Sequence, residues 1–157
     1  MTTADILKIE FESIKADLIK KHDELNLRAS GEWAESLESV ISSREHITNI
    51  KLYGNAYTEQ LVNGRKPGKF PPIKAIEKWI YDKGISAVGK DISISSLAFL
   101  IARKIANEGT KIYRKGGTDL ISSVITPERI QRIINQVSEI NLEVMVNGMI
   151  EQLKEVA

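Results

Sequence analysis

The sequence predicts a single α+β domain dominated by helices, with a long N-terminal helix packed on a small antiparallel sheet and further helices in the C-terminal half. Three observations lead to this class. Apolar residues recur at helical spacing over residues 3–27 and again after residue 72. Residues 36–53 carry the pattern of two short strands. The 157 residues fit one domain, 1–157, because no repeat, low-complexity tract or linker divides them.

Residues 3–27 are predicted as one long helix. Thr2 stands three residues before Asp5, which is the spacing of a capping box. The apolar positions that follow recur at helical intervals: Leu7, Phe11, Ile14, Leu18 and Leu25. Such a stripe is typical of a face buried in the domain, although a helix of this length also suits packing against a neighbouring subunit.

Residues 36–43 and 46–53 are predicted as the two strands of an antiparallel pair that turns at residues 43–45. The first strand has an alternative, because residues 37–40 would also suit a short helix. Trp33, which precedes the pair, is predicted to be a core residue, with a subunit contact as the alternative.

Residues 56–63 are predicted as a short helix that ends at Gly64, a residue suited to the left-handed conformation of a helix end. An exposed basic arm follows at residues 64–72, where three cations, three prolines, two glycines and one aromatic residue stand together. Proline and glycine favour an extended path there, and they disfavour both a helix and a central strand.

Two further helices are predicted, one from Pro72 to about Lys83 and one from Ser93 or Ser95 to Gly109. The first has an apolar face that includes Trp79, again with a core position favoured. In the second we expect five residues to point inward: Leu97, Leu100, Ile101, Ala102 and Ile105.

Residues 110–118 are predicted as a second basic and flexible segment, because glycines end it. Thr126-Pro127-Glu128 is a strong start for a last helix that runs to about Lys154. Within it, residues 140–147 alternate between apolar and polar side chains, which also fits a strand. Helix is the preferred prediction.

The residue types give no catalytic set. The chain has no cysteine, which excludes disulfides and thiolate chemistry. Its two histidines, His22 and His46, stand in no metal-ligand spacing, and the carboxylates are scattered beside cations. We therefore expect no enzyme activity, no cofactor and no metal; a hydrolase remains a distant alternative.

Each basic segment has two interpretations: a solvated loop, or a surface that contacts phosphate groups or acidic protein. The residues that would make such assembly or DNA contacts are Arg65, Lys66, Lys69, Phe70, Lys111, Tyr113, Arg114 and Lys115. The chain as a whole carries 22 cations and 21 anions. A net charge this close to zero permits self-association and limits any nucleic-acid binding to local patches.

Several segments appear in an order that resembles the tailed-bacteriophage neck proteins of the tail-completion, or head–tail joining, family. The more specific segments read Gly-Arg-Lys-Pro-Gly-Lys-Phe-Pro-Pro at 64–72 and Ala-Phe-Leu-Ile-Ala-Arg-Lys-Ile-Ala-Asn-Glu-Gly-Thr at 98–110. Weaker ones lie at 30–37 and 53–65, and the similarity covers about residues 30–125. Trp33 stands where the family usually has leucine, and residues 118–125 replace its Pro-Phe-Leu-Arg-Pro-like ending.

The resemblance implies a structural virion protein that forms a homo-oligomeric ring in the neck or tail. It would contact the portal or connector and the tail proteins, with DNA contact in the channel as a further implication. Short apolar runs and the absence of a signal peptide lead us to expect a soluble chain made in the host cytoplasm, without membrane contact. The main alternative is a small nucleic-acid-binding regulator that uses both basic loops.

Overall fold

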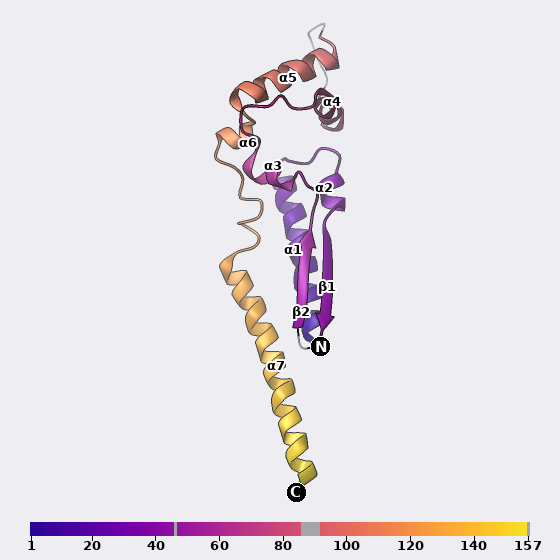
Figure 1. Ribbon diagram of the computed structural model, residues 1–157, viewed down its shortest axis with the longest axis vertical. Coiled ribbons are helices and arrows are strands. Elements are labelled where there is room, and N and C mark those ends of the chain that lie inside the picture. Colours follow the sequence, from indigo (N-terminus) through magenta and orange to yellow (C-terminus); the bar gives the residue numbers. More distant parts are fainter. Residues whose placement is uncertain (46, 86–91, 157) are drawn as a thin grey trace.

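The computed structural model describes residues 1–45, 47–85 and 92–156 (Figure 1). His46 and residues 86–91 lie outside this part, so the prediction made for His46 has no counterpart in the structure. The described elements, in chain order, are α1 Thr3–Glu24, α2 Glu32–Glu35, β1 Glu38–Arg44, β2 Ile47–Tyr53, α3 Thr58–Asn63, α4 Ile73–Asp82, α5 Ile94–Glu108, α6 Lys111–Arg114 and α7 Pro127–Val156.

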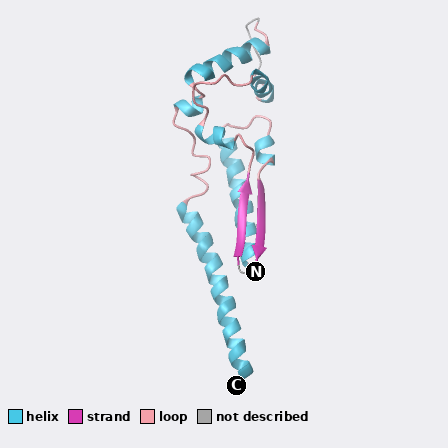
Figure 2. Ribbon diagram, viewed as in Figure 1, coloured by secondary structure: helices cyan, strands magenta, loops and turns pink. Residues whose placement is uncertain are grey.

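The α+β class is confirmed: one antiparallel pair of strands lies against α1, and the rest of the fold is mainly helical (Figure 2). The strands pair from Glu38 opposite Tyr53 to Arg44 opposite Ile47, which confirms the predicted pair with a start two residues later. The short-helix alternative over residues 37–40 is wrong, because β1 begins at Glu38. Alternate side chains of both strands are partly buried, and α1 lies against this hairpin.

The long N-terminal helix begins at the predicted cap. The Thr2 hydroxyl accepts a hydrogen bond from the Asp5 amide at 3.2 Å, and the Asp5 carboxylate accepts one from the Thr2 amide at 2.8 Å. These two bonds satisfy amide groups that the first turn leaves without partners. The Thr2 amide and, at 2.9 Å, the Thr2 hydroxyl both donate to the Asp5 carboxylate and lower the pKa of Asp5.

The core lies between α1, the α2 region and the segment before α7. Its buried members are Ile14, Leu18, Trp33, Leu37, Leu120, Val124 and Ile133. Trp33 is 1% exposed, which confirms its core position, and its indole nitrogen donates to the Thr58 hydroxyl at 2.9 Å. Leu120, fully buried, shows that the turns before α7 are part of the core.

His22 is also buried there, 2% exposed, and its ring stacks on Trp33 with centroids 4.5 Å apart. Charged residues precede and follow this histidine in the sequence, yet its ring faces the aromatic core. Its Nδ1 atom is 3.6 Å from Asp23, too far for a hydrogen bond, and has no partner in the described part of the chain. Burial therefore outweighs the nearby carboxylate and lowers the pKa of the imidazole, assisted by Arg28 and Lys83.

The first half of α7 is fixed to α1 by polar contacts around Arg129. This guanidinium donates to Asp17 at 2.7 Å and to Ser13 at 2.9 Å, and its side chain is 13% exposed. Further along, Thr3 donates to Asn141 at 2.9 Å. The predicted last helix is confirmed across residues 140–147, and the strand alternative is wrong.

Helices α4 and α5 pack against each other at the end of the molecule farthest from the C-terminus (Figure 1). Ile80, Ala98 and Ala102 are fully buried. The core position predicted for Trp79 is wrong, because this side chain is 39% exposed beside the buried Ile80. The inward position predicted for Leu100 is also wrong, since this residue is 49% exposed and the small alanines on either side take the buried face.

One side chain joins this pair of helices to the rest of the fold by ion pairs. Lys78 of α4 lies 3.0 Å from Glu32 of α2 and 2.8 Å from Asp82. The two carboxylates raise the pKa of Lys78 to about 12, Asp82 being the larger cause. Lys83 adds a hydrogen bond to the Asn26 carbonyl at 2.8 Å. In the described ranges no helix is both long and apolar enough to cross a membrane.

Candidate functional site

The two basic segments, predicted as separate loops, lie side by side in the structure. The Thr110 amide donates to the Arg65 carbonyl at 2.9 Å, and the Arg65 amide donates to the Thr110 hydroxyl at 2.9 Å. The Gly68 amide donates to the Ala106 carbonyl at 2.8 Å. These bonds fix the first half of the basic arm (residues 64–72) on the end of α5 and the start of α6.

Glycine is required where the arm meets α6. Gly64 has a φ of +72°, and a Cβ atom added to it would lie 2.3 Å from the Tyr113 amide nitrogen and 2.6 Å from the Thr110 hydroxyl. Gly109 has a φ of +78°, and its added Cβ would lie 2.8 Å from the Arg65 carbonyl oxygen. Side chains would therefore separate the two segments, since both conformations are also unfavourable for L-residues.

The segment predicted as flexible, residues 110–118, contains one turn of helix, α6. The Thr110 hydroxyl caps this turn by accepting from the Tyr113 amide at 3.3 Å. At the other end, Thr118 donates its amide to the Val62 carbonyl at 2.7 Å and its hydroxyl to the Leu61 carbonyl at 2.8 Å. Hydrogen bonds thus anchor both ends of the segment to residues 61–65. No local sequence pattern indicated these contacts.

The predicted contact residues fall into two groups. Arg65, Lys66 and Tyr113 line one open hollow of about 530 Å³ beside Gly64. The other predicted contact residues do not line this hollow, and they are exposed: Lys69, Phe70, Lys111, Arg114 and Lys115.

Two of the cations have partners: Arg114 is paired with Glu108 at 3.0 Å, and Arg65 donates to the Lys69 carbonyl at 3.1 Å. Lys66, Lys69, Lys111 and Lys115 form no ion pair with the part of the chain that is described. The two segments therefore make one basic surface.

Phe70 turns from the basic surface toward α5. Its ring lies against that of Phe99, with centroids 5.6 Å apart. Beside this contact runs an apolar depression of about 410 Å³, which we call the α5 groove; its lining residues are Ile73, Ile92, Ser95, Ser96, Phe99 and Leu100. Phe70, Phe99 and Leu100 remain 45%, 47% and 49% exposed, so this groove presents large apolar side chains to solvent.

A second apolar surface lies on the part of α7 that extends beyond α1 (Figure 1). Its side chains are between 42% and 71% exposed, and we call them the α7 stripe: Leu142, Met145, Val146, Met149, Ile150 and Leu153. Their spacing of three and four residues places them on one side of the helix. The sequence carried this signal, but the alternation over residues 140–147 obscured it.

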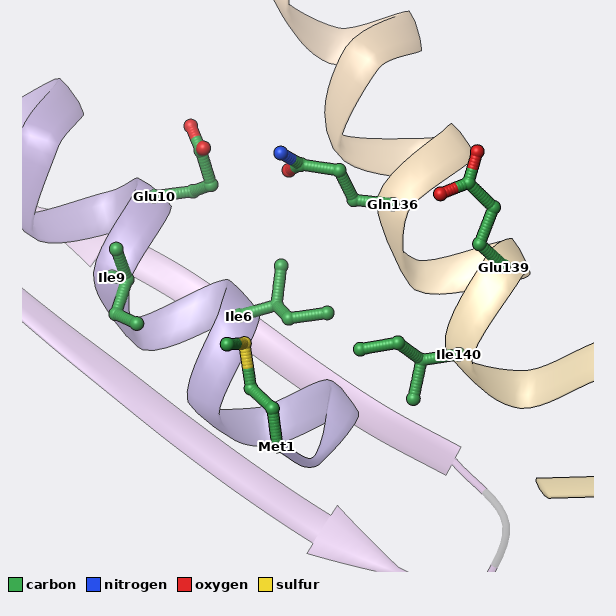
Figure 3. Close-up of a pocket in the computed structure, with 7 residues that line it drawn as sticks. All are labelled: Met1, Ile6, Ile9, Glu10, Gln136, Glu139 and Ile140. Atoms are coloured by element: carbon green, nitrogen blue, oxygen red, sulfur yellow. The ribbon is translucent and has the colours of Figure 1, made fainter. Parts of the chain in front are cut away.

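A smaller hollow of about 320 Å³ lies where the N-terminus of α1 meets α7. Figure 3 shows Ile6 and Ile140 pointing toward each other across it, with Met1 beside them. Ile6 is buried, whereas Met1 is 81% exposed. This hollow marks the end of the contact between the two helices.

Among the described residues, no three histidine or acidic side chains come together in a way that could hold a metal ion. Comparison with models of protein families, with curated protein sequences and with solved structures finds no match to this chain.

Proposed function

We propose that this chain is a structural subunit of a tailed-bacteriophage neck, assembled as a ring that joins the portal region to the tail. Two kinds of support combine in this proposal. The first is the order of sequence segments that resembles the tail-completion family. The second is the distribution of apolar side chains, which carries the structural part of the argument.

That distribution is the key observation. The α5 groove and the α7 stripe expose large apolar side chains at opposite ends of an elongated molecule (Figure 1). Contiguous apolar patches on a soluble protein mark places where another molecule binds. A subunit with one such surface at each end is suited to contact neighbours on two sides, as members of a ring do.

The proposal is tested in the phage or prophage that encodes the chain. Deleting its gene is expected to leave filled heads and finished tails unjoined, and supplying the protein from a plasmid is expected to restore joined particles. Electron microscopy of the lysate measures the joined fraction, and mass spectrometry of purified particles detects the chain. Particles that lack the chain and still join heads to tails would exclude the neck function.

A nucleic-acid-binding regulator is the second candidate, and the joining of the two basic segments is the observation that favours it. Six cations gather there: Arg65, Lys66, Lys69, Lys111, Arg114 and Lys115. If all six met phosphates, the logarithm of the DNA association constant would fall with the logarithm of salt concentration at a slope of about −5. A weaker slope is expected if Glu108 keeps Arg114 occupied.

Fluorescence anisotropy with a short duplex measures this slope. The double substitution Lys66→Glu and Lys69→Glu should remove most of the binding. Lys51→Glu on β2, an exposed cation outside the basic surface, is the matched control. Absence of binding at low salt would exclude this candidate.

A further inference from the structure

From these surfaces we infer that the α7 stripe of one copy binds in the α5 groove of the next copy, so that the chain assembles head to tail. The inference rests on the proposed function, because it names the contact through which the ring would form. The occupant of the groove is thus a second copy of this chain.

The α7 stripe lies on a different side of the helix from the residues that contact α1. Ile133 is in the core and Ile140 faces α1, whereas Leu142 and Met149 follow them by nine residues each. Nine residues are about two and a half helical turns. The apolar residues of α7 therefore move to the opposite side of the helix just beyond its contact with the N-terminal end of α1.

The groove and the stripe are both apolar, and the stripe is long enough to cross the groove. An apolar helix face with anchors three and four residues apart is the shape that a hydrophobic groove on another protein accepts. The stripe from Leu142 to Leu153 is about 17 Å long, and the part of α5 that lines the groove, from Ser95 to Leu100, is about 8 Å long. Phe99 and Leu100 stand near the middle of α5, where such a helix would cross it.

Charge favours this pairing over contact between two α7 stripes. Arg103 and Lys104 follow Phe99 and Leu100 by four residues and so extend the same face of α5. Glu139 and Glu143 lie along one edge of the α7 stripe, three residues before Leu142 and Val146. None of these four charged residues forms an ion pair within the described parts of the chain.

The α7 stripe and the α5 groove of the same molecule cannot bind each other. The polar contacts of Arg129 hold the first half of α7 on α1, and its outer half points away from α4 and α5 (Figure 1). The pairing therefore joins two copies through different surfaces. Contacts of this heterologous kind repeat from copy to copy, and they close into a ring when the rotation between copies allows it.

Light scattering on the purified full chain tests the pairing over a range of protein concentrations. The wild type is expected to form complexes of several copies. Met149→Glu in the stripe and Phe99→Glu in the groove should each weaken association by at least about tenfold, since each places a charge at the centre of the contact. Val144→Glu is the matched control, because Val144 is 67% exposed on the other side of the same helix.

A mixture of the two variants gives the sharper result. Each variant keeps one working surface, so an equimolar mixture of Met149→Glu and Phe99→Glu should form a complex of two chains and nothing larger. If Phe99→Glu alone associates as the wild type does, two stripes are pairing and the inference is wrong. A wild type that stays monomeric at every concentration also overturns it.

Cysteine cross-linking provides an independent measurement. The chain has no cysteine of its own, so a mixture of Met149→Cys and Leu100→Cys can form a disulfide between different variants only at this contact. Circular dichroism confirms that each variant is folded. If the purified chain self-associates but is missing from the particles, the contact is supported and the neck function is rejected. If the chain is present in the particles but does not self-associate, only the contact is rejected.

Discussion

Replacing Gly64 by alanine should loosen the basic surface, because two separate penalties meet at this residue. Its φ of +72° and ψ of −175° lie in a region that almost only glycine adopts, and this conformation costs another residue about 1–3 kcal/mol. The new Cβ would also lie 2.3 Å from the Tyr113 amide nitrogen, a backbone atom that cannot rotate away. Forcing an extra carbon into a packed site typically costs about 1–3 kcal/mol. We therefore expect Gly64→Ala to reduce the free energy of unfolding by about 2–6 kcal/mol.

Gly116→Ala is the matched control. Gly116 also has a positive φ, +85°, but an added Cβ there meets no atom within 4 Å. This variant should lose only the conformational part, about 1–2 kcal/mol. Thermal unfolding followed by circular dichroism compares the two, with about 2–4 °C expected per kcal/mol. Hydrogen exchange of the Arg65 and Thr110 amides shows whether the loss is local. Equal losses in both variants would refute the packing argument.

Two further predictions concern the core. Because burial lowers the pKa of His22 in the folded state, the unfolded chain binds more protons, so stability should fall as pH drops below 6.5, the ordinary histidine value, until the lowered pKa is reached. Urea unfolding from about pH 8 to about pH 5 measures this slope, which should flatten in His22→Phe; an unchanged slope would assign it to other groups. Arg129→Met should cost about 1–3 kcal/mol by leaving Asp17 without its partner. Lys154→Met, which removes an exposed pair, should change stability by less than about 0.5 kcal/mol; equal losses in the two variants, measured by the same unfolding, would contradict the role of Arg129.

Local patterns predicted the elements of this fold well, because caps and helical spacing act over a few residues. The capping pair Thr2 and Asp5 and the proline at 127 gave helix starts that the structure confirms. Trp79 and Leu100 were misplaced for a physical reason. Apolar spacing shows that a residue belongs to an apolar face, but not whether the same chain covers that face.

The candidate surfaces depended on contacts between distant segments. The hydrogen bond from the Arg65 amide to the Thr110 hydroxyl joins residues that are 45 positions apart. No local pattern around Arg65 therefore indicates this contact. The α7 stripe was visible in the sequence, yet its significance depends on where α1 ends. In the structure, the contact between α1 and α7 ends where Ile140 lies beside Ile6 (Figure 3).

The continuous length of α7 gives the molecule a mechanical property. Its 30 residues form a rod about 45 Å long, and only the first half of this rod contacts α1. A tilt of about 5° at Asn141, where the contact with α1 ends, would move the far end by about 2 Å. A displacement of the outer half would in turn act on the partly buried Arg129 side chain and on the packing around Ile133. The outer half of α7 thus acts as a lever that pivots where the contact with α1 ends, at Asn141.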